Sequence, residues 1–289
     1  MLTAVDDRPI DLHVHTTASD GDLSPRECVA RAAALGLAAI GIADHDTVAG
    51  NAEAMAAGEE MGVEVVPGLE VAAKHGHWSL HVLGYYPELG DAGLGRLLRR
   101  ARARRDERNP QILARLAALG LPVPFEEVAA EARHGVVGRP HIAAVMVRRG
   151  HVATAEEAFA RYLAKGRPAY VERRKPEAAE VLEVLLAARA VPVLAHPGTL
   201  GIESSDALEA LLGPLVELGL RGIEVHYHAH NAVQTALFGR AAERHGLAVT
   251  GGSDFHGAAK PDIELGRGLG GMHVPYRLLE RLKAERARL

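Results

Sequence analysis

Six histidines and three carboxylates stand at places in the sequence where they could hold metal ions. The chain has 16 histidines and one cysteine, so imidazole and carboxylate groups are its main candidate ligands. This mixed ligand set suits Mn²⁺, Zn²⁺ or Fe²⁺ better than Mg²⁺ or Ca²⁺, which prefer oxygen alone. The nine candidates are His13, His15, Asp20, His45, Glu70, His81, His196, Asp254 and His256.

The spacing of these residues matters more than their number. His13 and His15 are two residues apart at the end of an apolar run, so a strand would point both rings to one face. His45, His196, Asp254 and His256 follow further strand-like runs, Glu70 lies late in another, His81 falls within the fourth, and Asp20 lies in the first loop. Functional groups collect at the carboxyl ends of strands in parallel folds. A single histidine beside a strand is usually structural, but six histidines and three carboxylates at seven matching positions are hard to assign to chance.

Nine ligands are too many for one ion. A carboxylate such as Glu70 can bridge two ions roughly 3.5–4 Å apart, an arrangement that activates a hydroxide and clamps a phosphoryl group. The ligand set therefore indicates a multinuclear centre suited to hydrolysis.

The elements that must position these residues alternate between short strands and helices, which predicts a parallel sheet or barrel. The expected strands are 10–15, 37–43, 63–73, 78–85, 191–195, 222–227 and 247–251. Helices are expected at 48–61, 176–190, 206–218 and 232–245. A further helix begins after Ser24, which is followed by Pro25 and, three residues on, by Glu27, and it ends at Gly36.

The segment from about Asp91 to Tyr170 breaks this alternation. It shows helical pattern at 94–119, 125–134, 141–149 and 154–164 and no convincing strand. We expect a helical insertion between the fourth and fifth strands that covers the barrel mouth. The domain prediction is a barrel formed by residues 1–90 and 171–289, with residues 91–170 as a cap.

The ordered motifs resemble the polymerase and histidinol phosphatase (PHP) superfamily. The motifs are Asp11-Leu12-His13-Val14-His15-Thr16 with Ser19-Asp20-Gly21, Asp44-His45-Asp46, Pro67-Gly68-Leu69-Glu70, Ala195-His196-Pro197 and Gly252-Ser253-Asp254-Phe255-His256. The resemblance implies an α/β fold, a distorted seven-stranded (β/α)7 TIM-like barrel, with up to three metal ions per chain. Mn²⁺ is the expected metal, with Zn²⁺, Fe²⁺ or Mg²⁺ as alternatives.

The resemblance also implies how the ligands divide among the metals. His13, His15, Glu70 and Asp254 would hold the first ion; Glu70, His81 and His196 the second; Asp20, His45 and His256 the third. His77 competes with His81 for its place, and Asp46 is expected to orient a ligand from behind.

Gly138-Arg139-Pro140-His141-Ile142-Ala143 and residues 165–171 are similar to a bacterial subgroup within this superfamily. That subgroup includes nucleoside 3′,5′-bisphosphate phosphatases and exonucleases that trim RNA from its 5′ end. It implies that Arg139 and His141 contact substrate phosphate; a guanidinium suits bidentate phosphate binding. His230 is the preferred phosphate contact among the polar residues that end the sixth strand.

The predicted function is metal-dependent hydrolysis of a phosphate ester. A metal-bound hydroxide held by His13, His15, Glu70 and Asp254 would attack phosphorus. The favoured substrate is a nucleoside 3′,5′-bisphosphate such as pAp, cleaved at its 3′-phosphate. A short 5′-phosphorylated RNA is the alternative; histidinol phosphate, a metal amidohydrolase activity and a degenerate accessory barrel fit less well.

Composition limits the partners and the location. The net charge of −4 argues against non-specific binding of long duplex nucleic acid, and the single Cys28 fits a reducing compartment. The sequence has no signal-like N-terminus and no apolar run long enough to span a membrane, so a cytoplasmic protein is expected. The basic run 96–105 is most simply a solvated helix face, with steering of anionic substrate as the alternative.

Overall fold

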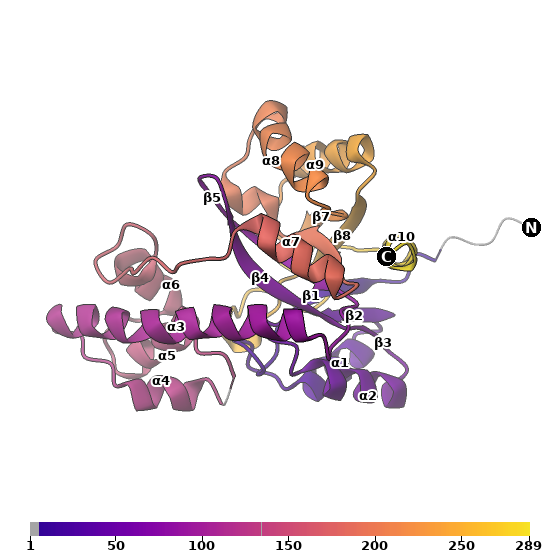
Figure 1. The fold of residues 1–289 in the computed structure, drawn as a ribbon. Coiled ribbons are helices and arrows are strands. Elements are labelled where there is room, and N and C mark those ends of the chain that lie inside the picture. Colours follow the sequence, from indigo (N-terminus) through magenta and orange to yellow (C-terminus); the bar gives the residue numbers. More distant parts are fainter. Residues whose placement is uncertain (1–5, 134) are drawn as a thin grey trace, which may run out of the picture.

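The computed structural model describes residues 6–133 and 135–289, and these form an α/β fold (Figure 1). The described residues contain eight strands. They are β1 (Ile10–Val14), β2 (Ala39–Ile42), β3 (Glu64–Val66), β4 (Gly68–His75), β5 (Trp78–Tyr85), β6 (Val191–Leu194), β7 (Gly222–Tyr227) and β8 (Ala248–Gly252).

The strands form two sheets. The first has the order β1-β2-β3 and is parallel, and the second has the order β4-β5-β6-β7-β8. Single parallel bridges join the two edge regions of the larger sheet to the smaller sheet, between Val14 of β1 and Phe255 after β8, and between His45 after β2 and Glu70 of β4. In the described residues the sheets approach each other at these edges without forming one continuous barrel wall.

The predicted count of seven strands was wrong because one expected strand is two. Pro67 interrupts the run 63–73, so β3 ends at Val66 and β4 begins at Gly68 in the other sheet. The expectation of a parallel sheet also fails locally, since β5 is antiparallel to both β4 and β6. Only Gly76 and His77 connect β4 to β5, and so short a connection permits only an antiparallel hairpin.

Most helices lie where the sequence placed them. They are α1 (Pro25–Ala34), α2 (Asn51–Met61), α3 (Ala92–Ala118), α4 (Phe125–Glu131), α5 (Arg139–Arg148), α6 (Ala155–Ala158), α7 (Ala178–Ala187), α8 (Ser205–Glu217), α9 (Ala232–His245) and α10 (Arg277–Ala287). A π-helical turn, η1 (Phe159–Leu163), follows α6, and short 3₁₀ turns η2 (Pro197–Leu200) and η3 (Gly257–Ala259) follow two of the candidate ligands. The Ser24–Glu27 capping box starts α1 as expected, whereas α10 was not predicted. His134, the expected end of one helix, lies outside the described residues.

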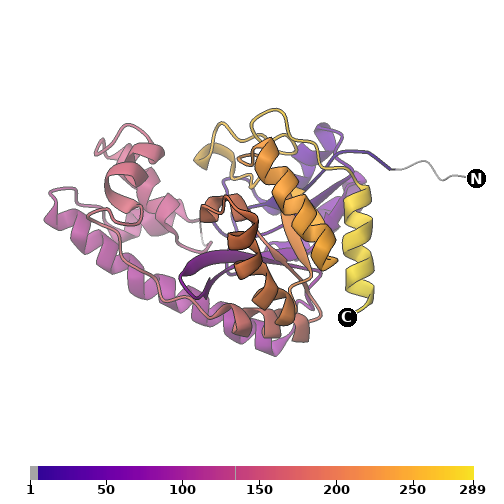
Figure 2. The ribbon, with the colours of Figure 1, turned by 90° about the horizontal axis from the view of Figure 1, so that it is seen from above.

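Helices α4, α5 and α6 stand to one side of the sheets, around the far end of α3 (Figures 1 and 2). No strand occurs in the described part of the segment 91–170. It has an apolar core of its own, which includes Ile112, Val128 and Met146. The first turns of α3 instead pack Leu94 and Leu97 into the core beneath β4, β5 and α7. A single long helix thus ties this segment to the sheets.

None of the helices in the described chain has the length and apolarity needed to cross a membrane.

Candidate metal centre

All nine predicted ligands lie together in the structure. They form four overlapping groups in which the possible ligand atoms lie within 4.8 Å of one another. The groups are His15, Asp20, His45 and His256; His13, His15 and Asp254; His13, Glu70 and His196; and His45, Glu70 and His81. Each group shares at least one member with another, so the nine residues make one continuous cluster.

Strand β1 and the residue after it contribute two buried histidines to the cluster. His13 lies on β1 and His15 directly follows it, and both side chains are fully buried with their rings on the same side. His15 Nε2 lies 3.2 Å from Asp254 Oδ1, and His13 Nε2 lies 3.6 Å from the same oxygen. Asp254 follows β8, which lies beside β1, so the two neighbouring strand ends deliver these three side chains to one point.

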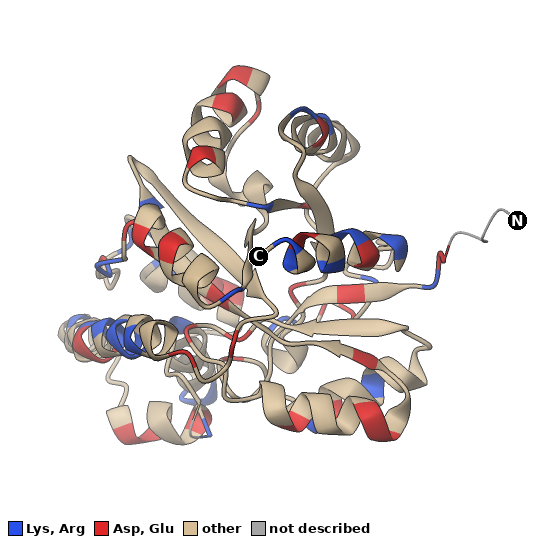
Figure 3. Cartoon of the chain, turned by 45° about the vertical axis from the view of Figure 1, so that its right-hand side comes forward, with Lys and Arg blue, Asp and Glu red and all other residues tan. Residues whose placement is uncertain are grey.

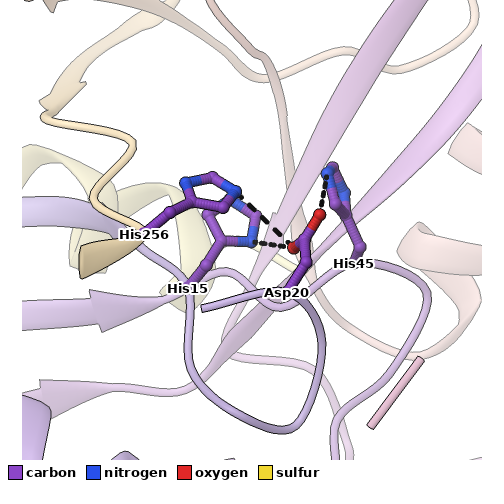
Figure 4. Close-up of side chains that lie close together, drawn as sticks. All are labelled: His15, Asp20, His45 and His256. Carbon is purple, nitrogen blue, oxygen red and sulfur yellow. Dashed lines mark ion pairs between the residues drawn. The ribbon is translucent and has the colours of Figure 1, made fainter. Parts of the chain in front are cut away.

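Asp20 lies between three histidines, as Figure 4 shows. Its Oδ1 is 3.7 Å from His15 Nδ1 and 3.5 Å from His256 Nε2. Its Oδ2 is 3.9 Å from His45 Nε2. These separations are too long for hydrogen bonds, and they leave space between the carboxylate and the rings.

Glu70 is at the centre of the cluster and is 1% exposed. Its Oε1 lies 2.8 Å from His81 Nδ1 and 3.1 Å from His196 Nε2, while its Oε2 lies 2.9 Å from His45 Nδ1. Burial alone would raise the pKa of Glu70, but His81, His45 and His13 outweigh it and hold the pKa well below its ordinary value. The residue is therefore an anion whose two oxygens face different sets of rings.

The donor atoms of the cluster fit divalent metal ions. His13 Nε2, both nitrogens of His15 and Asp20 Oδ1 are buried and have no hydrogen-bond partner among the described residues. Orphaned buried polar atoms are rare in native proteins, and several that converge on one space fit the coordination of a cation. Burial, followed by the nearby His256, lowers the pKa of His15 to about 3. A neutral ring keeps the lone pair that metal coordination requires.

Two buried carboxylates that the sequence reasoning missed position the ligands from behind. Glu224 Oε1 lies 3.0 Å from His13 Nδ1, and its Oε2 accepts the backbone N–H of His196 at 2.7 Å. Asp11 accepts the backbone N–H groups of His13 and Ser253 at 3.1 and 2.9 Å. These contacts fix both His13 and the loop that carries Asp254, since the outer hydrogen bonds of a ligand set its orientation.

Asp44 holds the loop that carries Asp20 in place through hydrogen bonds. Its carboxylate is fully buried and accepts both the backbone N–H and the hydroxyl of Thr16, at 2.8 and 2.7 Å. The Ser19 hydroxyl donates to it at 2.6 Å. The motif positions beside the ligands therefore act as anchors for the loops.

Asp254 presents its two oxygens to different environments. Oδ1 faces the histidines of β1, whereas Oδ2 accepts hydrogen bonds from Lys260 Nζ at 2.6 Å and from the Tyr227 hydroxyl at 3.1 Å. Neither Lys260 nor Tyr227 was predicted, and no spacing in the sequence links them to Asp254.

The structure distinguishes His81 from His77, the two histidines considered for the same ligand position. His81 faces Glu70 inside the cluster, whereas His77 is exposed in the hairpin turn and its ring packs on Trp78 at 4.0 Å. Only His81 is placed with the other candidate ligands.

A cavity of about 200 Å³ opens between the cluster and residues 91–170. Asp20, His45 and His81 line one end of it, so it reaches the candidate metal centre. Its other walls carry five cationic side chains: Arg105, Arg108, Arg139, Arg173 and Lys175. Of these, Arg139 was a predicted phosphate contact, and Arg105 ends the basic run 96–105.

The cationic wall has one buried counterion. Asp46 Oδ2 accepts from Arg105 Nε at 2.6 Å and from Arg173 at 2.8 Å. Asp46 was expected to orient a metal ligand, and that prediction was wrong, because its bonded carboxylate oxygen holds the cavity arginines instead. Burial alone would raise the pKa of Asp46, but the two arginines outweigh it and lower the pKa to about 2.

Arg108 and Arg139 lack such a counterion. Within residues 6–133 and 135–289, no carboxylate oxygen lies within 4.0 Å of either guanidinium. Arg108 donates to Asn109 Oδ1, and Arg139 donates to the carbonyl of Leu163. Burial and then the neighbouring Arg105 lower the pKa of Arg108 to about 9. Two cations are thus held at the cavity with no negative charge beside them.

The other predicted phosphate contacts lie elsewhere. His141 lines a second cavity beside Asp20, and its Nδ1 accepts the backbone N–H of Gly138 at 3.0 Å. His230 lines neither cavity; its Nδ1 bonds to the carbonyl of Val225, and its Nε2 accepts the N–H of Gly198. The structure therefore places His230 behind the loop after His196, with both ring nitrogens already in use.

Most of the basic run 96–105 faces solvent. Figure 3 shows Lys and Arg concentrated along α3, and Arg96, Arg99 and Arg100 are exposed. Arg102 instead donates a hydrogen bond to the backbone carbonyl of Asp46, and Arg105 donates one to its carboxylate. The run is therefore a solvated helix face whose last arginine contributes to the cavity.

Comparisons with known proteins identify the family of the chain. The model of the PHP domain matches residues 11–172. A 3′,5′-nucleoside bisphosphate phosphatase from Chromobacterium violaceum is 32% identical over 89% of this chain and 90% of its own length. A 5′-3′ exoribonuclease from Haemophilus influenzae is 33% identical over 90% of this chain and 93% of its own length.

Two further comparisons extend these matches. A phosphoribosyl 1,2-cyclic phosphate 1,2-diphosphodiesterase from Eggerthella lenta is 34% identical over 86% of this chain and 94% of its own length. A solved structure from Bifidobacterium adolescentis, described as a metal-dependent phosphoesterase, superposes with a TM-score of 0.87 at 32% identity, covering 96% of both chains. The chain therefore belongs to the PHP domain family and is a metal-dependent phosphoesterase, a hydrolase, of that family.

Proposed function

We propose that the protein removes the 3′-phosphate from nucleoside 3′,5′-bisphosphates such as pAp, giving a nucleoside 5′-monophosphate and phosphate. One observation carries this proposal: a single cavity has the candidate metal cluster at one end and five cationic side chains at the other. A substrate that satisfies both ends needs two anionic groups, one to be hydrolysed and one to be held.

The metal ligands in this proposal are the nine clustered residues. His13, His15, Glu70 and Asp254 hold the first ion, Glu70, His81 and His196 the second, and Asp20, His45 and His256 the third, with Mn²⁺ preferred to Zn²⁺, Fe²⁺ or Mg²⁺. Bound metals supply a hydroxide near neutral pH and neutralise charge on the phosphoryl oxygens. The buried carboxylates Glu224, Asp11 and Asp44 keep the ligands oriented for this task.

The fold in this proposal is an open form of the distorted (β/α)7 barrel of the family. The contacts of β1 with β8 and of β2 with β4 support it, because they bring both edge strands of the larger sheet against the smaller one. Residues 1–90 and 171–289 form the barrel domain, and residues 91–170 form the cap. The separate apolar core of the described cap residues supports this division.

The cationic wall binds the 5′-phosphate. Arg108 and Arg139 are the main contacts, because a phosphate dianion supplies the counterion that the buried Arg108 and the half-buried Arg139 lack. Arg105 and Arg173 are already turned into the cavity by Asp46, so they need little reorganisation. Holding the 5′-phosphate fixes the distance to the 3′-phosphate, and positioning of this kind lowers the barrier to hydrolysis.

His141 serves the scissile phosphate in this proposal. Its Nδ1 accepts from Gly138, so the proton of the neutral ring is on Nε2. That N–H is available to a phosphate oxygen beside Asp20, which lines the same cavity. His230, whose two nitrogens are bonded to backbone, has no hydrogen bond left to offer a phosphate and acts instead by holding the loop after His196.

The names of the relatives support a substrate of this class. The relative from C. violaceum is named for nucleoside bisphosphates, and the relative from E. lenta for a phosphoribosyl cyclic phosphate, so both names describe two phosphate groups. The relative from H. influenzae is named for RNA. A pocket for a terminal phosphate beside a hydrolytic centre would serve all three, with the small bisphosphate favoured for this chain by the modest cavity.

A substrate panel tests the proposal. Metal-reconstituted protein is assayed for phosphate release from pAp, 3′-AMP and histidinol phosphate. We expect pAp to have a kcat/KM at least roughly 100-fold above that of 3′-AMP, which lacks the 5′-phosphate. In Arg139→Met the ratio of kcat/KM for pAp to that for 3′-AMP should fall, while Arg99→Met, at an exposed position of α3 outside the cavity, should leave it unchanged. Equal turnover of 3′-AMP and pAp by the unaltered protein would contradict the proposal.

A further inference from the structure

The protein has a second cavity next to the first. Its volume is about 170 Å³, and Asp20 and Pro140 line it as they line the arginine cavity. The two spaces therefore adjoin at these residues, beside the candidate metal centre. The second cavity continues along the loops after β1 and after β8, as its wall residues Thr17 and Ala258 show.

The second cavity differs from the first in charge. The arginine cavity has five cationic side chains, whereas the lining of the second includes Arg133 and His141 together with the carboxylates Asp20, Asp22 and Glu131. Arg133 also donates to the backbone carbonyl of Asp22. Negative groups in the wall disfavour another phosphate, so the chemistry favours an uncharged occupant.

The size and lining of the second cavity suit a flat ring. An apolar cavity of roughly 150 Å³ is enough to bind benzene, so this volume admits one aromatic ring. Four alanines, Ala132, Ala144, Ala258 and Ala259, provide small apolar surfaces from the cap and from the loop after β8. The amino groups of a nucleobase could donate to the nearby carboxylates.

We propose that the second cavity binds the nucleoside that stays esterified to the scissile phosphate when the substrate is an RNA 5′ end. This inference rests on the proposed function, since it keeps the terminal 5′-phosphate in the arginine cavity and the scissile phosphate beside Asp20. In a bisphosphate the scissile phosphate reaches only the Asp20 and His141 end of the second cavity, and the rest of that cavity stays free. In a 5′-phosphorylated dinucleotide it receives the second nucleoside, and so the protein can act on a phosphodiester.

The same bond breaks in both substrates. With the dinucleotide pApA, an oxygen of water forms a new bond to phosphorus, the bond from phosphorus to O3′ of the first nucleoside breaks, and O3′ receives a proton. The products are two molecules of AMP. With pAp, the same step yields AMP and inorganic phosphate. The leaving group is identical, and the substrates differ only in what remains attached to phosphorus.

Filling the second cavity tests the inference. Ala144→Leu, on α5, and Ala258→Leu, in η3, each add volume from a different wall, and Ala236→Leu on the exposed face of α9 is the matched control. The measured quantity is the ratio of kcat/KM for pApA to kcat/KM for pAp. We expect this ratio to fall at least about tenfold in the two cavity variants and to stay constant in the control. The melting temperature of each variant verifies folding.

The outcomes separate the two proposals. AMP as the sole product from pApA, with the expected fall in the ratio, supports the subsite. Release of pAp and adenosine would mean that the other ester bond breaks, and unchanged ratios in both cavity variants would place the second nucleoside elsewhere; either result overturns the inference. Cleavage of pAp without cleavage of pApA contradicts the subsite alone. Cleavage of neither substrate contradicts the proposed function, and the subsite with it.

Discussion

Glu224 and His13 form a buried pair, with Glu224 Oε1 3.0 Å from His13 Nδ1 and neither side chain exposed to solvent. In the neutral ring that metal coordination requires, this contact would keep the proton on Nδ1 and leave Nε2 facing Glu70 and Asp254. The second oxygen of Glu224 holds the backbone of His196. The carboxylate of Glu224 thereby orients two candidate ligands, His13 on β1 and His196 after β6.

Glu224→Gln should weaken metal binding without unfolding the protein. The amide keeps the shape of the side chain but loses the charge that orients His13, so we expect metal affinity to fall roughly 10–100-fold. Competition titration with a metal-binding dye measures this. Glu217→Gln, at the exposed end of α8, is the control. Unchanged affinity in Glu224→Gln would show that His13 needs no orienting partner.

Metal ions should stabilise the fold. Buried donor atoms without partners, such as His13 Nε2 and Asp20 Oδ1, gain a cation only in the folded chain. Each ion present at 100 times its Kd should then add roughly 2.7 kcal/mol to the unfolding free energy. Thermal melts with a chelator and after Mn²⁺ addition measure the difference. His15→Ala should reduce the rise in melting temperature that Mn²⁺ produces. A melting temperature that does not change with metal would count against the cluster as a metal centre.

Arg108→Met should raise stability and lower substrate affinity together. The guanidinium is buried without a carboxylate partner, so its removal should stabilise the ligand-free protein by on the order of 1 kcal/mol. The same change removes a phosphate contact, which should raise the KM for pAp at least roughly tenfold. Thermal melts and steady-state kinetics provide the two readings. A loss of stability would mean that Arg108 serves the fold rather than the substrate.

Asp46→Asn should destabilise the protein. The change leaves Arg105 and Arg173 buried without their counterion, at a cost of roughly 3–5 kcal/mol near neutral pH. Because the pKa of Asp46 falls from 3.8 to about 2 on folding, its contribution is complete above about pH 4 and is lost as the pH falls through about 2. Denaturant titrations at several pH values should show the wild-type advantage narrowing below pH 4.

The clustering of the nine candidate ligands could be anticipated from sequence because it depends on one simple rule. Residues at the carboxyl ends of neighbouring strands meet, and His13, His196 and Asp254 follow that rule. His81 does not, since it lies in the middle of the antiparallel β5. The family resemblance, rather than the strand rule, is what led to it.

Other features depend on contacts that local sequence does not encode. Arg108 and Arg173 reach the cavity from segments far apart in the chain, and only the path of α3 brings them together. Glu224 lies in a buried strand, where an acidic residue has meaning only once His13 is beside it. The β4–β5 hairpin, by contrast, could have been predicted from the sequence, because Gly76 and His77 leave too few residues for the crossover that a parallel pair needs.

The pairing of β1 with the end of the chain determines when the centre can assemble. Asp11 bonds to Ser253 and Gly266, which follow it by 242 and 255 residues, so the two halves of the cluster close a very long loop. Contacts of such high sequence separation form late in folding. During synthesis, the ligands before residue 90 emerge from the ribosome long before Asp254 and His256. The nascent chain thus holds an incomplete set, and full metal loading must wait for its last strand.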